Sequence, residues 1–172
     1  PTFLAPTAVG LAAAASVYAL WSRRNRAYHS SESVASAYDA WTEDRLLETL
    51  WGEHVHLGHY GNPPKRRDFR RAKADFVHEL VHWSGLDRLP AGSRVMDVGC
   101  GIGGSARILA RDYGFNVLGI SISPAQIRRA TELTPEGLSC RFAVMDALDL
   151  NLTDCEFDGV WSVEAGPHMP DK

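Results

Sequence analysis

The sequence predicts an α/β fold with a doubly wound, Rossmann-like parallel sheet, preceded by a helical region. Two observations lead to this prediction. From residue 90 onward, short apolar segments alternate with helical segments, and the turn "GCGIGG" at residues 99–104 joins the first apolar segment to the first helix. Strands that alternate with helices pair in parallel and place the helices against the faces of the sheet. The length of 172 residues, with 45% hydrophobic and 23% charged residues, is typical of a globular chain.

The first 22 residues form an apolar segment. No charge occurs before residue 23, and Arg23, Arg24 and Arg26 follow at once. This length just suffices for a helix that crosses a bilayer, and the arginines would hold its end on the cytoplasmic side. We expect a membrane anchor helix over residues 1–22. A cleaved signal peptide or the end of a transit peptide is the alternative, although a signal peptide normally carries its positive charge before the apolar run.

Residues 28–89 are predicted to form a helical cap or lid region. Residues 30–51 show helical spacing in two pieces, with Thr42 as the expected N-cap of the second piece. A loop rich in Gly, Pro and His follows at residues 52–65. An amphipathic helix is expected at residues 68–83. Its apolar face is expected to carry Phe69, Ala72, Phe76 and Leu80.

Six basic residues lie in "KRRDFRRAKAD", residues 65–75. We expect them on the polar side of the amphipathic helix. They form either a solvated helix face or a contact with anionic lipid close to an anchored N-terminus.

Residues 90–172 are predicted to form the first half of the α/β domain. Cap signals fix two of its helices: Gly114 ends a helix that begins at Ser105, and Ser123 with Pro124 starts a helix that runs to Leu133. The expected strands are residues 94–98, 115–120, 140–144 and 157–163. Ligands of such sheets bind beyond the carboxyl ends of the strands.

The glycine turn matches the dinucleotide pattern GxGxxG at Gly99, Gly101 and Gly104. Two features argue against NAD. The Asp97 carboxylate would repel a pyrophosphate, and Ser121 stands where an acid would bind the ribose hydroxyls. S-adenosylmethionine fits better because it has no phosphate and carries a sulfonium and an ammonium group. The helix N-terminus after the turn favours the carboxylate of that ligand.

The motif "DVGCGIGG" resembles the first cofactor motif of the class I S-adenosylmethionine methyltransferases, and residues 154–162 resemble the second. The resemblance implies that Asp146 and Ala147 face the adenine, and that Ser121 and Gln126 replace the missing ribose acid. Cys100 is expected to be packed inside the turn. The implied cofactor-binding set is Asp97, Gly99, Cys100, Gly101, Gly103, Ser121, Gln126, Asp146, Ala147 and Ser162.

Four segments are similar to those of the tocopherol and plastoquinone methyltransferases: "WGEHVHLGHYG", "DVGCGIGGS", "ISPAQIRRA" and "VWSVEAGPHMPDK". The resemblance covers residues 28–172. Within this group, the motif "YDAWTEDRLLETLWGEHVHLGHYG", the GPH triplet and the apolar N-terminal segment resemble enzymes that methylate 2-methyl-6-phytyl- or 2-methyl-6-solanesyl-1,4-benzoquinol. The resemblance implies a lipid-soluble prenylated quinol as acceptor. The alternatives are another lipid acceptor, such as tocopherol, a sterol or a small amine, and a non-catalytic cofactor-binding protein.

Methylation of an aromatic carbon requires a ring made electron-rich by loss of a phenolic proton. Since a hydroquinol titrates near the tyrosine value, about 10, a base or strong acceptor is needed. Glu164 and His168 follow the fourth strand and are the catalytic candidates, with His56 as a weaker one. Glu164 could instead cap a helix or pair with an arginine. Lid or substrate contacts are expected from Trp51, His59 and Tyr60.

Other features narrow the partners and the compartment. A net charge of −3 gives no drive toward nucleic acid, so we expect no nucleic-acid partner. The histidines of the loop match no standard zinc spacing, so we expect no metal site. Three cysteines without a CxxC pair favour a reducing compartment. We expect a membrane-associated protein with its catalytic domain on the cytoplasmic or stromal side, in a photosynthetic bacterium or a plastid. The oligomeric state is left open.

The sheet of the resembling family normally has seven strands, and four are expected here. The resemblance therefore implies that the 172 residues hold the cofactor half of a longer enzyme. We expect this piece to bind cofactor weakly at best and not to turn over.

Overall fold

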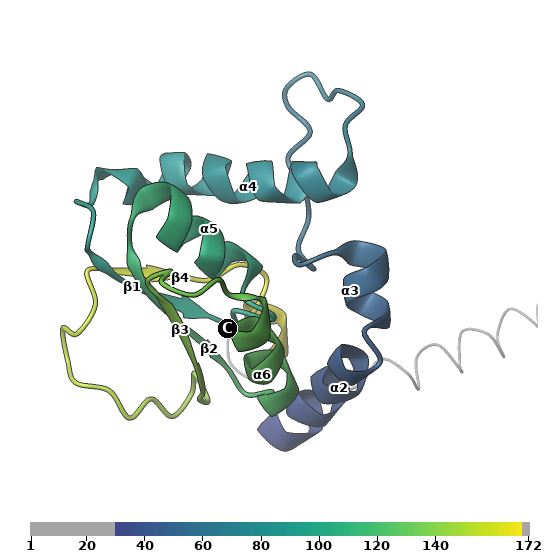
Figure 1. Cartoon of the computed structure of the whole chain (residues 1–172), viewed down its shortest axis with the longest axis vertical. Coiled ribbons are helices and arrows are strands. Elements are labelled where there is room, and N and C mark those ends of the chain that lie inside the picture. Colours follow the sequence, from purple (N-terminus) through teal and green to yellow (C-terminus); the bar gives the residue numbers. More distant parts are fainter. Residues whose placement is uncertain (1–29, 170–172) are drawn as a thin grey trace, which may run out of the picture.

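The computed structural model describes residues 30–169, in which a parallel four-stranded sheet of order β3-β2-β1-β4 packs against helices (Figure 1). The expected α/β fold with a parallel sheet is confirmed. The elements are α2 (Ser31–Glu43), α3 (Leu46–Trp51), α4 (Phe69–Ser84), η1 (Leu86–Arg88), β1 (Arg94–Val98), α5 (Gly104–Tyr113), β2 (Asn116–Ser121), α6 (Pro124–Leu133), β3 (Cys140–Val144), β4 (Gly159–Trp161) and η2 (Gly166–His168).

The proposed anchor at residues 1–22 lies outside the described residues. Among residues 30–169, no helix combines the length and the hydropathy needed to cross a bilayer.

Local cap signals place the helices that frame the site. The Ser123 side chain accepts a hydrogen bond from the Gln126 backbone at the start of α6, where Pro124 is the first helical residue. Gly114 ends α5 with a φ of 70°, in the left-handed region that glycine adopts without a steric penalty. These predictions from the sequence are confirmed.

The helical region differs from expectation at Thr42. This residue lies inside α2, and its hydroxyl donates to the Tyr38 carbonyl at 2.8 Å. α3 begins instead after Arg45, which has a left-handed φ of 50° and provides no side-chain cap. The expected N-cap role of Thr42 was therefore wrong. Its hydroxyl satisfies a carbonyl one turn back, as threonine often does within a helix.

The buried face of α4 is also rotated from the expected one. Its buried residues are Ala72, Lys73, Val77 and Val81, whereas Phe69 is 39% exposed. Val77 and Val81 join the core formed with α5 and the sheet. Lys73 was expected on the polar side. This expectation was wrong, because its buried ammonium group donates hydrogen bonds to the backbone carbonyls of Trp51 and His54.

The two faces of the sheet are covered differently. Val95 and Val117 lie in the core beneath α4 and α5. On the opposite face, the core of Met96, Val98, Leu118 and Ile120 is covered by apolar residues of the 145–157 connection and by Met169.

The register brings polar and small residues to one edge of the sheet. Asp97 of β1 pairs with Gly119 of β2 on one side and with Trp161 of β4 on the other. The carboxyl ends of these three strands therefore meet at the same level, which is where ligands of open α/β sheets bind.

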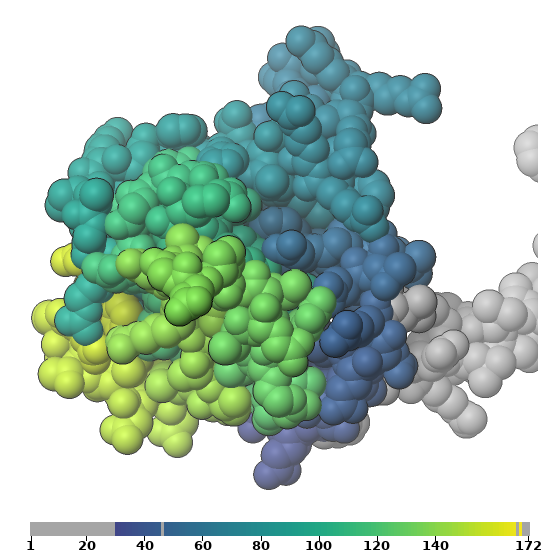
Figure 2. Space-filling model, viewed as in Figure 1, coloured from purple at the N-terminus to yellow at the C-terminus, as the bar shows by residue number. Residues whose placement is uncertain are grey.

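The helical region closes this edge. The space-filling view shows α2 directly against α6, and α3 continues the same wall (Figure 2). Arg129 of α6 makes a paired contact with Glu48 of α3, at 2.7 and 2.8 Å.

Candidate functional site

The turn after β1 combines a left-handed backbone at two glycines with open space. Gly99 and Gly101 have φ values of 75° and 55°, which L-residues with a side chain rarely adopt. A Cβ at Gly99 would lie 2.4 Å from the Cβ of Ala165, whereas a Cβ at Gly101 would meet no atom within 4 Å. Gly99 is therefore needed for close packing, and Gly101 leaves its backbone open to a ligand.

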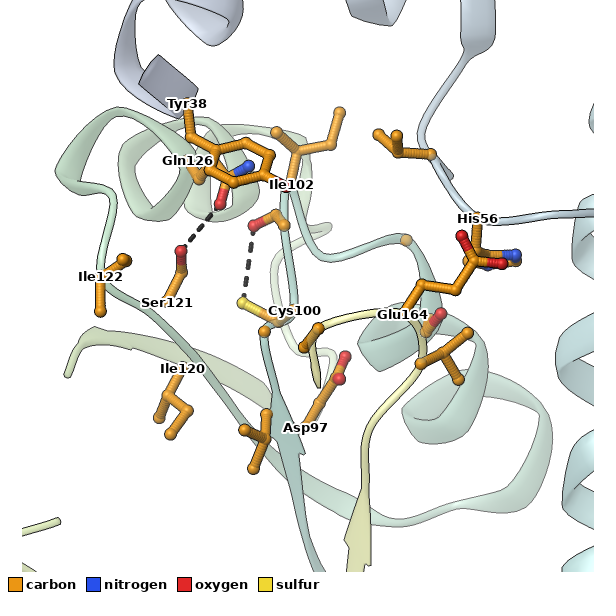
Figure 3. Close-up of a pocket in the computed structure, with 18 of the residues that line it drawn as sticks. Tyr38, His56, Asp97, Cys100, Ile102, Ile120, Ser121, Ile122, Gln126 and Glu164 are labelled. Carbon is orange, nitrogen blue, oxygen red and sulfur yellow. Dashed lines mark hydrogen bonds between the residues drawn. The ribbon is translucent and has the colours of Figure 1, made fainter. Parts of the chain in front are cut away.

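A cavity of ≈ 380 Å³ opens beside this turn. α2 and the segment 52–56 form one wall, and the ends of β1, β2 and β4 with residues 145–148 form the others (Figure 3). Most of its side chains are apolar: Val34, Tyr38, Trp41, Leu47, Val55, Ile102, Ile120, Ile122, Met145, Leu148, Trp161, Val163 and Met169 line it. The lining suits a ligand that is mostly apolar and has a few polar anchors.

Asp97 supplies the buried charge of the cavity. The residue is 2% exposed, and its Oδ2 atom has no hydrogen-bond partner within the described chain. Burial raises the pKa of this carboxyl to about 7. A buried oxygen without a donor is costly unless a ligand satisfies it. An ammonium group would donate a hydrogen bond to this oxygen, and a sulfonium would be attracted to the carboxylate by its charge, so the residues present fit S-adenosylmethionine.

Ser121 and Gln126 are held together at the end of β2. The Ser121 hydroxyl donates to the Gln126 side-chain carbonyl at 2.7 Å, and both residues line the cavity (Figure 3). Tyr38 of α2 lies beside Gln126 in the same view, and burial raises the pKa of its phenol. These groups provide hydroxyl and amide contacts at the position where other dinucleotide-type sites have an acidic residue that binds the ribose hydroxyls.

The structure brings eight of the ten expected cofactor residues to the cavity: Asp97, Gly99, Cys100, Gly101, Ser121, Gln126, Asp146 and Ala147. Asp146 accepts a hydrogen bond from the Leu148 backbone at 2.9 Å, which shapes the turn that carries Ala147. The Cys100 thiol faces the Gly101 carbonyl at 3.5 Å, and burial raises its pKa. It is packed and protonated, as a structural cysteine would be.

Gly103 and Ser162 do not line this cavity. Gly103 packs against Phe142 and Arg107, since a Cβ at this position would lie 2.6 Å from the Phe142 ring. The Ser162 hydroxyl donates to the Val98 carbonyl at 3.2 Å, and the residue lies instead on a groove between the end of α4 and β4. A direct cofactor contact remains a prediction for both residues.

Glu164 reaches from the end of β4 to the loop of the helical region. It has a left-handed φ of 56°, and its Oε1 accepts a hydrogen bond from the Leu57 backbone at 3.0 Å. The residue lines the cavity (Figure 3). A carboxylate held by a backbone donor from a segment 107 residues away is oriented toward the site and tied to the loop.

His54 and His56 form a neutral pair in the wall. His56 Nδ1 lies 2.7 Å from the Leu57 carbonyl and therefore carries the proton, so His56 Nε2 accepts from His54 Nδ1 at 3.1 Å. Burial, the other ring and the nearby cations lower the pKa of His54 to about 3, and burial lowers that of His56. Both nitrogens of His56 are engaged, which does not favour the role of base that the sequence suggested.

Two buried cations hold this wall in place. Lys73 Nζ donates to the carbonyls of Trp51 and His54 at 3.1 and 2.7 Å. Arg107, with a side chain 7% exposed, pairs with Glu53 at 2.6 Å. Lys73 therefore fixes the backbone of this segment at two carbonyls, and Arg107 fixes its Glu53 side chain, each by charge-assisted hydrogen bonds.

The three expected lid residues lie outside the cavity lining. The Trp51 ring packs under the Lys73 ammonium at 5.9 Å, the His59 backbone donates to the Ala72 carbonyl at 2.7 Å, and Tyr60 is 40% exposed. The backbone of His168 belongs to η2, and its side chain lies outside the described part of the structure. The lid or substrate role of Trp51, His59 and Tyr60 remains a prediction, and so does the catalytic role of His168.

Several wall residues were not singled out from the sequence. Val34, Tyr38 and Trp41 lie at helical spacing in the segment 30–51, and the structure turns this apolar face of α2 into the cavity. The signal was present in their spacing, which indicates a buried face without saying what it covers. Among residues 30–169, no cluster of three or more His, Cys, Asp or Glu is placed to hold a metal ion.

Comparisons with known proteins agree with this geometry. Residues 95–172 match the family model described as a methyltransferase domain. The chain is similar to the 2-methyl-6-phytyl-1,4-hydroquinone methyltransferase of Synechocystis sp., with 62% identity over 95% of this chain and 51% of that protein. It is 43% identical to a probable chloroplastic tocopherol O-methyltransferase of Oryza sativa, over 82% of this chain and 40% of that protein. The chain has a class I methyltransferase fold. The resemblance inferred from the motifs is confirmed.

The fold is shared with a solved structure of a different named activity. The [4+2]-cyclase SpnF matches with a TM-score of 0.73 and 29% identity, over 82% of this chain and 52% of that one. A protein named for cyclisation thus shares the fold of proteins named for methyl transfer, because the residues of the site and not the fold determine the reaction. The chain spans about half the length of the curated relatives it matches.

Proposed function

We propose that the full-length protein is an S-adenosylmethionine-dependent methyltransferase that methylates a ring carbon of a prenylated benzoquinol, such as 2-methyl-6-phytyl- or 2-methyl-6-solanesyl-1,4-benzoquinol. The supporting observation is a cavity in which the open turn at Gly101 and the Asp97 carboxylate meet an apolar wall, with Asp97 Oδ2 lacking a partner among the described residues. The relative from Synechocystis, named for a phytyl hydroquinone, is 62% identical to this chain.

The cofactor would be held by the turn after β1, with Asp97 near its cationic groups and Ser121 and Gln126 near its ribose. When bound, S-adenosylmethionine supplies an electrophilic methyl group on a sulfonium. The protein holds this group in a cavity whose apolar lining excludes water and strengthens the attraction between Asp97 and a cation.

Glu164 is the group that we assign to the acceptor. Its carboxylate lines the cavity and is oriented by the Leu57 amide, so it can accept a phenolic proton as the ring becomes nucleophilic. The neutral His54 and His56 shape the same wall and leave this task to the carboxylate.

The decisive experiment offers methyl-labelled S-adenosylmethionine and three acceptors to the full-length protein. These are 2-methyl-6-phytyl-1,4-benzoquinol, γ-tocopherol and an unprenylated methylhydroquinone. We expect label in the phytyl quinol, at a rate at least tenfold above that for the other two. Transfer to tocopherol alone would favour the function named for the relative from Oryza sativa. No transfer to any of them, with intact binding of S-adenosylhomocysteine, would refute the proposal.

The same proposal implies a membrane-associated protein whose catalytic domain faces the cytoplasm or stroma. It is supported by the uncharged residues 1–22 followed by arginines, and by the lipid solubility of the proposed substrate. Sedimentation with liposomes tests it. The full-length protein should pellet with them, and a variant without residues 1–22 should stay in the supernatant. Equal sedimentation of the two would contradict the anchor.

A further inference from the structure

The feature that leads beyond the proposed function is a carboxylate of α2 at the N-terminus of α6. Asp39 lies in the middle of α2, and its Oδ1 accepts hydrogen bonds from the Ser123 hydroxyl at 2.6 Å and from the Ala125 backbone at 3.0 Å. α2 packs against α6 although more than eighty residues separate the partners (Figure 2). A carboxylate is stabilised at this position by two donors and by the positive end of the helix dipole.

This carboxylate also sets the orientation of the hydroxyl that caps α6. A serine hydroxyl has a single O–H donor, and Ser123 uses it in the hydrogen bond to Asp39. Its lone pairs are then left for the Gln126 backbone N–H, which donates to Ser123 Oγ at 3.1 Å. Without Asp39, the hydroxyl would be free to rotate away from this arrangement.

The hydrogen-bond chain continues into the cavity. The Ser123 backbone donates to Ser121 Oγ at 3.2 Å, and Ser121 Oγ donates to the Gln126 side chain at 2.7 Å. Ser121, Ser123 and Gln126 are 7%, 0% and 8% exposed. In such a dry environment each bond is electrostatically stronger than it would be in water, and the members of a network support one another.

The helix that carries Asp39 is itself a wall of the cavity. Val34, Tyr38 and Trp41 of α2 line it from the side opposite the sheet. One side chain therefore links two parts of the site: the cap helix that covers the cavity and the pair Ser121 and Gln126 at its floor.

We propose that Asp39 is a positioning residue that couples the docking of α2 to the arrangement of Ser121 and Gln126 for cofactor binding. The inference rests on the proposed function, because it assigns the cavity to the cofactor. Asp39 touches no reacting atom and acts through Ser123.

Another contact between the same two helices supplies a matched control. Arg128 of α6 pairs with Glu43 of α2 at 3.3 Å, and both side chains are more than 60% exposed. A pair so open to solvent contributes little, because water and salt screen it. Glu43→Gln therefore removes a carboxylate from α2 without touching the hydrogen-bond chain.

The experiment compares full-length wild type, Asp39→Ala, Asp39→Asn and Glu43→Gln. Calorimetry with S-adenosylhomocysteine, steady-state kinetics and hydrogen exchange of peptides from α2 are measured for each. Asp39→Ala should raise the dissociation constant and the KM for S-adenosylmethionine about tenfold and change kcat less than threefold. Asp39→Asn should lie between Ala and wild type, because an amide oxygen still accepts both hydrogen bonds but carries no charge.

Hydrogen exchange in α2 should be faster in ligand-free Asp39→Ala than in the wild type, and Glu43→Gln should match the wild type in every measurement. Wild-type affinity in Asp39→Ala, or a loss of kcat at constant KM, would overturn the proposal. So would an equal loss of affinity in Glu43→Gln, which would indicate general loosening of the helices.

The exchange measurement separates this inference from the proposed function. If the wild type binds neither S-adenosylmethionine nor S-adenosylhomocysteine, the proposed function fails. The docking role of Asp39 is still tested in that case, because hydrogen exchange of α2 is measured without ligand. An unchanged hydrogen-exchange rate of α2 in Asp39→Ala would overturn it. If the alanine variant does not fold, the asparagine variant carries the comparison.

Discussion

The Asp97→Asn substitution tests the electrostatic basis of the site, because its effects on stability and on binding have opposite signs. The pKa of Asp97 is raised by burial from 3.8 to about 7. The folded state therefore keeps a proton that the unfolded chain has already lost. The stability that comes from this proton is fully present below pH 3.8 and is lost as the pH rises to about 7.

The size of the effect follows from this pH window. Between pH 5 and pH 7, this group alone should lower the wild-type free energy of unfolding by roughly 2 kcal/mol. Asp97→Asn is nearly isosteric and does not titrate, so it should lack this decrease. Its free energy of unfolding should exceed that of the wild type at pH 8, where a buried charge is costly.

Urea unfolding of both full-length proteins at pH 5, 6, 7 and 8 measures the difference. The free energies should diverge with rising pH, with the variant the more stable. Parallel pH dependences for the two proteins would refute the argument, because Asp97 would then titrate alike in the folded and unfolded states.

Ligand binding provides the opposite readout. A cation beside Asp97 favours its ionised form, so the wild-type affinity for S-adenosylmethionine should rise with pH up to about 7 and then level off. Asp97→Asn should bind at least tenfold more weakly at pH 8, without this pH dependence. A more stable variant with unchanged affinity would show that the carboxylate does not serve the ligand.

Three further substitutions test the turn, the acceptor group and the wall. Gly101→Val has to adopt a φ of 55° and places a side chain in the open space of the turn, so calorimetry should show cofactor affinity reduced more than tenfold; wild-type affinity would contradict the placement of the ligand. Glu164→Gln can still accept from the Leu57 amide, so kcat should fall roughly 100-fold or more at constant cofactor affinity, and an unchanged kcat would exclude Glu164 as proton acceptor. Lys73→Met removes an ammonium that donates to two carbonyls, so urea unfolding should show a free energy of unfolding lower by about 2–3 kcal/mol. Proteolysis should also cut the segment 52–57 sooner than in the wild type. Equal protease resistance of the two proteins would contradict the bracing role of Lys73.

The elements of the site that the sequence predicted are those with local signals. The turn at residues 99–104 is identified by its glycines, and α6 by Ser123 and Pro124 at its start. Such signals act within a few residues, so a linear pattern contains them. The strands were likewise indicated by apolar runs, and the parallel pairing of the first three followed from the helices between them.

The contacts that assemble the site were not predicted, because they join residues far apart in the chain. Asp39 with Ser123 and Glu164 with Leu57 are separated by 84 and 107 residues. Lys73 illustrates a second reason. A basic residue in a basic run is normally solvated, and its burial depends on two carbonyls from a loop that periodicity cannot place.

The electrostatics of the wall assign different roles to Asp97 and Glu164, two of the acidic residues that line the cavity. Lys73 and Arg107 brace the segment 52–57, and the same cations help to keep His54 neutral, so neither ring of the histidine pair is poised to take a proton. Asp97 is buried, and its Oδ2 atom has no hydrogen-bond donor among the described residues, which suits a cationic ligand. Glu164 is exposed on the cavity rim and oriented by a backbone N–H, which suits a group that meets the acceptor. Because their environments differ this much, Asp97 can bind a cation and Glu164 can accept a proton without competing for either task.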